Sequence, residues 1–149
     1  MPKKIRVFLD TSVIIAAVLS PTGGARQVFY LGEAGILDLV VGPNVLREAD
    51  EVVRRKVPVS LPLLAQLLAA GRVETAPKPT QKQIETAQAR FQYPPDAHVL
   101  AEAMATQPAW FITHDQEHFL DQRSDIKLSF EIGTPGDLIQ TIKDGYRPS

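Results

Sequence analysis

A short apolar run that ends in an aspartate and continues at once into a second apolar run constrains this chain more than any other feature. Residues 5–9 (IRVFL) have the length and apolar character of a strand, and residues 11–19 (TSVIIAAVL) follow Asp10 as a buried helix that ends at Ser20. An ionisable side chain between two buried elements lies close to the core, where carboxylates are uncommon. Asp10 also interrupts the apolar stretch too early for a signal peptide or a membrane helix.

The rest of the chain alternates short apolar segments with helical patterns. Such an alternation predicts an α/β fold with an open parallel sheet that helices cover on both faces through right-handed crossovers. Ligands of such sheets bind beyond the carboxyl ends of the strands. Further strands are predicted at residues 37–41, 73–75, 110–113 and 130–132, and further helices at residues 25–34, 44–56, 61–70, 81–90, from 96, and from the Thr134-Pro135-Gly136-Asp137 start.

Composition narrows the class of protein. The 149 residues, 44% of them hydrophobic, are enough for one domain over residues 1–149 with a sizeable core. Lys and Arg (16) nearly balance Asp and Glu (17), and the net charge of −1 gives no overall positive field for gathering nucleic acid. The absence of cysteine excludes disulfides, thiolate zinc sites and thiol nucleophiles. We expect a cytoplasmic protein with no membrane partner.

Four carboxylates are expected at the carboxyl end of the predicted sheet. Asp10 and Asp115 each follow a strand, Asp96 opens a helix, and Glu48 lies in a helix that follows a strand. Unpaired carboxylates packed together repel each other, so such a cluster is tenable mainly when divalent cations neutralise it. Hard oxygen ligands select Mg²⁺ or Mn²⁺, and a pair of these ions supports phosphodiester hydrolysis without a protein nucleophile. The pattern therefore predicts metal-dependent phosphodiester hydrolysis.

Each acid also has a simpler explanation. Aspartates at helix starts, such as Asp96 and Asp115, are common as caps, and Glu48 alone is typical of a solvent-facing helix residue. Asp10 fits a structural and a functional role about equally well. The joint pattern of the four acids is more specific than any one of them and favours a site.

The segments that carry these acids resemble the motifs of PIN-domain nucleases. Residues 8–14 (FLDTSVI) look like the opening motif, and residues 46–48 (LRE) look like the second acid in its helix. Residues 96–103 (DAHVLAEA) resemble the third motif, and residues 112–115 (ITHD) resemble the fourth. The order matches throughout, and the resemblance spans about residues 5–140. Within the family it points to VapC-like toxins of bacterial and archaeal toxin–antitoxin modules.

The resemblance implies a three-layer α/β/α sandwich with a central, mainly parallel five-stranded sheet. It also implies a Mg²⁺- or Mn²⁺-dependent endoribonuclease with an RNA substrate and a possible cognate antitoxin. Residues 61–68 hold more leucine than one buried face needs, which favours a homodimer or an antitoxin contact, although core packing explains them equally well. The implied catalytic and metal-ligating residues are Asp10, Glu48, Asp96 and Asp115, with support from Thr11, Ser12 and Thr113.

Other functions stay open at this point. A catalytically weak PIN scaffold that binds RNA or protein and a structure-specific DNA nuclease both share the resemblance, although four intact acids favour an enzyme. A dehalogenase-like phosphatase needs an aspartate where Ser12 stands, and a glycine-rich phosphate loop is not evident. His114 and His118 lack an obvious third zinc ligand. The basic run at residues 54–56 suits a helix C-terminus as well as RNA phosphates.

Overall fold

A computed structural model describes residues 3–90, 94–121 and 128–145, without the side chains of residues 94–96. Its strands form one sheet with the order β3-β2-β1-β4-β5, and every neighbouring pair is parallel. The predicted five-stranded α/β sheet is therefore confirmed, and it is parallel throughout. The strands are β1 (Ile5–Leu9), β2 (Leu37–Val41), β3 (Glu74–Thr75), β4 (Trp110–Ile112) and β5 (Glu131–Gly133).

The helices agree closely with the periodicity of the sequence. They are α1 (Thr11–Leu19), α2 (Gly24–Glu33), α3 (Pro43–Lys56), α4 (Leu61–Ala70), α5 (Gln81–Arg90), α6 (Pro94–Thr106) and α7 (Pro135–Gly145). Two short helical turns, η1 (Pro58–Ser60) and η2 (Gln116–Leu120), complete the described elements. Within the described ranges, none of these helices is long and apolar enough to cross a membrane.

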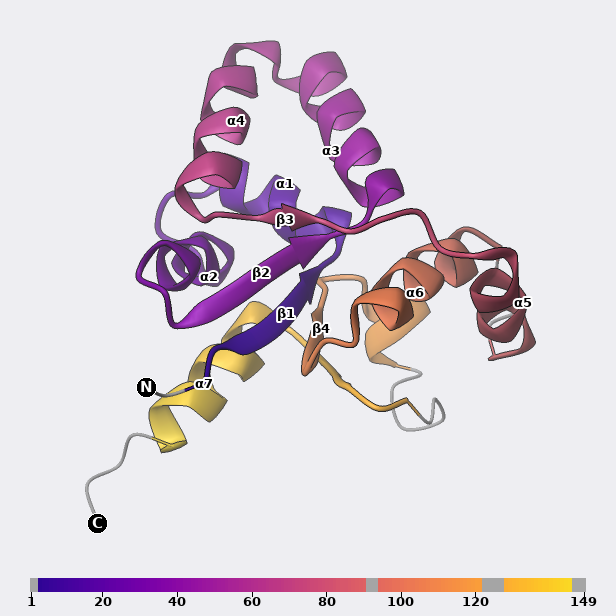
Figure 1. Ribbon diagram of the computed structural model, residues 1–149. Helices are drawn as coiled ribbons and strands as arrows, with labels where there is room; N and C mark the ends of the chain where they lie inside the picture. The colour runs from indigo at the N-terminus through magenta and orange to yellow at the C-terminus, as the bar shows by residue number, and fades with distance from the viewer. Residues whose placement is uncertain (1–2, 91–93, 122–127, 146–149) are drawn as a thin grey trace.

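Helices cover both faces of the sheet (Figure 1). The chain moves from β1 to β2 to β3 in one direction and then returns across the sheet to β4, so right-handed crossovers place the two sets of helices on opposite faces. Helices α1 to α4 pack together, α5 packs on α6, α6 also contacts α3, and α7 packs on α2, β4 and β5. The three-layer sandwich expected from the sequence is confirmed.

The core holds the central strands and the turn that follows β4. Val7, Phe8 and Leu9 at the end of β1 are fully buried, as expected for a parallel strand covered on both faces. The ring of Phe111 in β4 lies 5.6 Å from that of Phe8 and 4.9 Å from that of Phe119 in η2. Packing of Phe119 therefore anchors η2 beside the carboxyl end of the sheet.

The start of α6 and the start of α7 show how proline and capping residues behave here. The sequence predicts that Pro94-Pro95 precedes the helix, but α6 begins at Pro94. The N–H groups of the first turn have no acceptor within a helix, so proline, which has no N–H, is tolerated there. The predicted start of α7 is confirmed. The Asp137 N–H donates to Thr134 Oγ1 and the Thr134 N–H donates to Asp137 Oδ2, each at 3.0 Å.

Candidate active site

Asp10 lies at the junction of β1 and α1, and the neighbouring strand holds its side chain. The Asp10 N–H donates to the Ile112 carbonyl at 3.0 Å, which fixes the two strand ends side by side. Asp10 Oδ2 accepts hydrogen bonds from Thr113 Oγ1 at 2.8 Å and from Ser12 Oγ at 2.9 Å. Burial raises the pKa of Asp10, the hydroxyl bonds lower it, and the charge of Asp115 raises it. A buried carboxylate of this kind favours a neutralising cation.

Glu48 lies in α3, the helix that follows β2, and a buried threonine reaches it. Thr11 Oγ1 donates to Glu48 Oε2 at 3.4 Å. Thr11 is the residue directly after Asp10, so this bond connects the β1–α1 junction to α3. The rest of the Glu48 side chain is exposed to solvent. Glu48 and Asp10 therefore lie at the same end of the sheet.

Asp115 follows β4 and makes its bonds through η2 and Thr113. Its Oδ1 accepts the His118 N–H at 3.0 Å, and its Oδ2 lies 3.0 Å from His118 Nδ1. The Asp115 N–H donates to Thr113 Oγ1 at 2.9 Å, so one threonine hydroxyl bonds both Asp10 and the backbone of Asp115. Asp115 thus caps a helical turn, the structural role considered from the sequence, and lies next to Asp10 as well.

The fourth acid, Asp96, is in the first turn of α6, but its side chain lies outside the described residues. Among the side chains that the structure describes, no group of three or more His, Asp or Glu could hold a metal ion. The expectation that all four acids form one metal site therefore stays a prediction. The donors suit Mg²⁺ or Mn²⁺ chemically, since all of them are carboxylate oxygens.

A cleft of about 450 Å³ opens beside Glu48, between α3 and α6. Arg47 contributes a cation to it, and Arg47 Nη2 donates to Asn44 Oδ1 at 2.9 Å. An exposed guanidinium at the edge of a cleft can bind a phosphate group through charge-assisted hydrogen bonds. The cleft is lined by Asn44, Arg47, Glu48, Glu51, His98 and Val99.

Sequence reasoning missed Glu102, a fully buried acid in α6. Its carboxylate accepts the Asn44 N–H at the start of α3, with Oε1 at 3.1 Å and Oε2 at 3.3 Å. Burial raises the pKa of Glu102 to about 7, while bonds from Asn44 and from the Val45 N–H and the charge of Arg47 lower it. Its segment, AHVLAEAMA, is apolar almost all round the helix, and this signal could have shown that no solvent-facing position was left for the glutamate.

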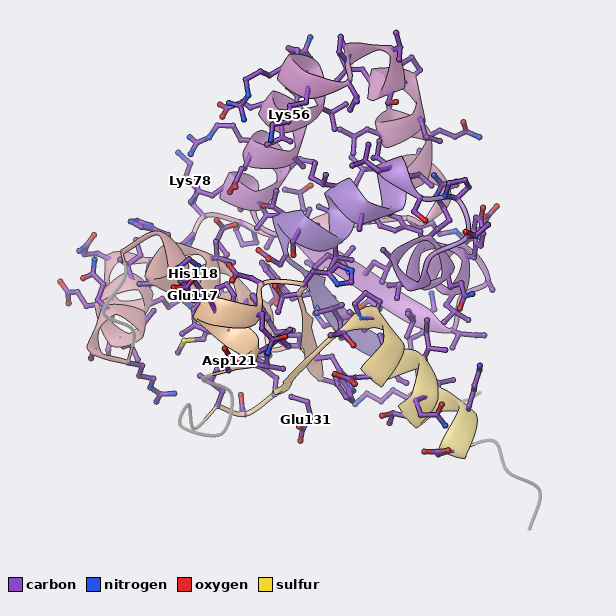
Figure 2. The ribbon with its side chains drawn as sticks, turned by 180° about the vertical axis from the view of Figure 1, so that it is seen from behind. Lys56, Lys78, Glu117, His118, Asp121 and Glu131 are labelled. Atoms are coloured by element: carbon purple, nitrogen blue, oxygen red, sulfur yellow. The ribbon has the colours of Figure 1, made fainter. Side chains whose placement is uncertain are left out.

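The basic run at the C-terminus of α3, residues 54–56, lies apart from the candidate site acids. Arg54 Nε and Nη2 bond both carboxylate oxygens of Asp50, at 3.2 and 3.1 Å. Figure 2 shows Lys56 at the far end of α3, well away from His118 on η2. The helix-terminus explanation of this run fits the structure.

An α/β sandwich with carboxylates at the carboxyl ends of its parallel strands occurs in enzymes of several classes, so the fold alone does not identify the function. The sequence pattern of the PIN domain matches residues 6–117 of the chain. The chain therefore belongs to the PIN-domain family, whose members are generally nucleases. The resemblance inferred from the four motifs is confirmed.

Solved structures with a similar fold include two VapBC complexes. One is a crystal structure of DNA-bound VapBC from Salmonella typhimurium, with a TM-score of 0.63 and 16% identity over 88% of this chain and 98% of that chain. The other is VapBC2 from Rickettsia felis bound to a DNA fragment from their promoter, with a TM-score of 0.62 and 11% identity over 86% and 97%. No curated protein sequence matches this chain.

Proposed function

We propose that the protein is a Mg²⁺- or Mn²⁺-dependent endoribonuclease, the toxin component of a toxin–antitoxin module, with residues 1–149 as one nuclease domain. One observation carries the proposal. Hydrogen bonds through Thr113 and Thr11 connect Asp10 to Asp115 and to Glu48, at the carboxyl end of the sheet of a PIN-domain protein. Three chain segments that are distant in sequence thus meet at one end of the sheet, which supports a shared site for the acids that they carry.

In the proposed site, carboxylates would bind the metal ions, and neighbouring hydroxyl groups orient these carboxylates. Bound divalent ions would neutralise the carboxylates, activate water and stabilise charge on the phosphodiester. Thr113 and Ser12 fix the direction of the Asp10 carboxylate, and Thr11 restrains Glu48. The proposed ligands are Asp10, Glu48, Asp96 and Asp115.

The cleft between α3 and α6 is the proposed path of the RNA backbone. Arg47 is exposed beside Glu48, and its guanidinium donates to Asn44, which also lines the cleft. A guanidinium can bind a phosphate group in bidentate fashion, through two parallel N–H···O hydrogen bonds. Because the net charge of the chain is −1, such local contacts must supply the phosphate affinity.

Cleavage of single-stranded RNA tests the proposal. We expect cleavage only with added Mg²⁺ or Mn²⁺, complete loss of cleavage with EDTA, and products with a 5′-phosphate and a 3′-hydroxyl. These ends are read by labelling and mass spectrometry. Cleavage in EDTA, or a 2′,3′-cyclic phosphate product, would refute the proposed chemistry, because both indicate attack by the RNA 2′-hydroxyl. Cleavage of DNA but not RNA would favour the DNA nuclease, and metal-independent RNA binding without cleavage would favour the scaffold.

We also propose a homodimer that a cognate antitoxin contacts. In α4, Leu64 and Leu67 are buried, whereas Leu61, Leu63 and Leu68 pack against the core but stay half-buried, which leaves part of the leucine-rich segment accessible to a partner. The similar solved structures are VapBC complexes, which supports a partner of this kind. Light scattering at micromolar concentration is expected to give twice the monomer mass. A monomer mass at all concentrations would contradict the dimer.

A further inference from the structure

Glu102 joins the two helices that form the walls of the cleft. The carboxylate belongs to α6, and it receives the Asn44 N–H in the first turn of α3. The contact is so close that a Cβ on Gly42, the residue before α3, would overlap the Glu102 carboxylate. The start of α3 therefore lies directly on this side chain.

The same contact leads to the cleft through one further hydrogen bond. Asn44, whose N–H bonds Glu102, accepts a bond from Arg47 through its side-chain oxygen at 2.9 Å. Arg47 and Glu48 lie one helical turn after Asn44 and line the cleft opposite His98 of α6. A shift of the first turn of α3 would therefore move Glu48 relative to α6.

Stability alone does not account for a charged side chain at this position. Burial raises the pKa of Glu102 to about 7, which means that the folded protein disfavours the ionised form relative to the unfolded chain. A neutral side chain of the same shape avoids this cost. The two carboxylate oxygens instead give two acceptors to the N-terminal N–H groups of α3, those of Asn44 and Val45.

We propose that Glu102 is a positioning residue of the nuclease site: it fixes the first turn of α3 against α6 and so sets the place of Glu48 relative to the acid contributed by α6. This inference rests on the proposed function. Glu102 does not itself bind the metal ion or the substrate. It acts through Asn44 and the backbone of α3.

The isosteric change Glu102→Gln tests this role. Its amide nitrogen replaces one of the two acceptors, so we expect Mn²⁺ to bind about tenfold more weakly and the N–H groups of residues 44–48 to exchange faster in the metal-free protein. The thermal midpoint at pH 8 is expected to stay the same or rise, which a purely structural role does not predict. Mn²⁺ binding is measured by electron paramagnetic resonance, and exchange is measured by mass spectrometry.

Two further variants complete the experiment. Asn44→Pro removes the same N–H from the side of α3, at a first-turn position that tolerates proline, and it also removes the side-chain oxygen that bonds Arg47. It is expected to weaken Mn²⁺ binding at least as much as E102Q. Glu85→Gln, an exposed change on α5, is the matched control and is expected to leave binding and exchange unchanged.

The outcomes separate this inference from the proposed function. Unchanged Mn²⁺ affinity in E102Q, with normal binding by the unmodified protein, overturns the positioning role alone. Weaker binding without faster exchange in α3 also overturns it, because the charge of Glu102 would then act through space. Failure of the unmodified protein to bind Mn²⁺ overturns both proposals.

Discussion

Asp10→Asn is expected to reduce metal-dependent RNA cleavage by about a hundredfold or more at limiting metal. Asparagine keeps the size of the side chain and can still accept the Thr113 and Ser12 hydroxyl bonds, but it removes the negative charge that a divalent ion needs from a ligand. The rate is measured at several Mn²⁺ concentrations. Full cleavage by this variant would show that Asp10 does not bind the metal.

The same variant is expected to lose activity without losing stability, so a loss of cleavage cannot be explained by unfolding. Burial raises the pKa of Asp10 in the folded protein, so the folded state binds the proton more tightly than the unfolded chain does. The contribution of this group to stability is therefore complete at pH values below its unfolded pKa and is lost as the pH rises through its folded pKa. We expect metal-free D10N to unfold at the same or a higher temperature than the unmodified protein at pH 8.

Two companion variants calibrate the effect of Asp10. Thr113→Val removes one hydroxyl that orients Asp10 and lowers its pKa, so about a tenfold loss of cleavage is expected. Asp38 is partly exposed and forms an ion pair with Arg6, away from the candidate site. Asp38→Asn is therefore expected to leave cleavage unchanged. Equal losses in all three variants would point to misfolding rather than to a lost ligand.

Gly42→Ala is expected to be the most destabilising single change near the cleft, by about 3 kcal/mol. The backbone of Gly42 has φ −87° and ψ 162°, values that alanine adopts without strain, so the cost comes from steric overlap, and the three atoms nearest to the added Cβ all belong to Glu102. Urea denaturation measures the free energy of unfolding. Gly145→Ala is the control, because a Cβ on Gly145 would meet no atom within 4 Å.

A double-mutant cycle assigns this cost to one contact. In the Glu102→Ala background the carboxylate is gone, but the Cβ of residue 102 would still lie 2.6 Å from the new Cβ at position 42. We therefore expect Gly42→Ala to cost about half as much there as in the unmodified protein. If Gly42→Ala costs the same free energy of unfolding in both backgrounds, the overlap with the Glu102 carboxylate is not the source of the cost.

The elements with strong periodicity were predictable from the sequence almost to the residue. β1, α1, β2, α4 and α5 have their predicted bounds, because each is an apolar run or a helical pattern bounded by glycine, proline or polar residues. β3 is shorter than predicted, and it lies at the edge of the sheet, where only one neighbour supplies hydrogen bonds. Pro94 and Pro95 start α6 instead of preceding it.

The candidate site was predictable in its acids but not in its contacts. Asp10, Glu48 and Asp115 were recognisable because they follow strands whose ends must meet in a parallel sheet. The bonding of Asp115 to His118 depends on the geometry of η2, which spacing alone does not reveal. Glu102 was missed because its role comes from α3, almost sixty residues earlier in the chain.

The strand order has a consequence for the protein during its synthesis. β4 inserts beside β1, yet more than a hundred residues separate Asp10 from Thr113 along the chain. A nascent chain that ends within α6 already carries Asp10 and Glu48, but it lacks β4 and Thr113, the residue after it that bonds the Asp10 carboxylate. Contacts so distant in sequence slow folding, because the entropy of closing a long loop is lost before they form. We therefore expect the proposed nuclease activity to be absent from partly synthesised chains, because the contacts that hold Asp10 can form only when nearly the whole chain has emerged from the ribosome.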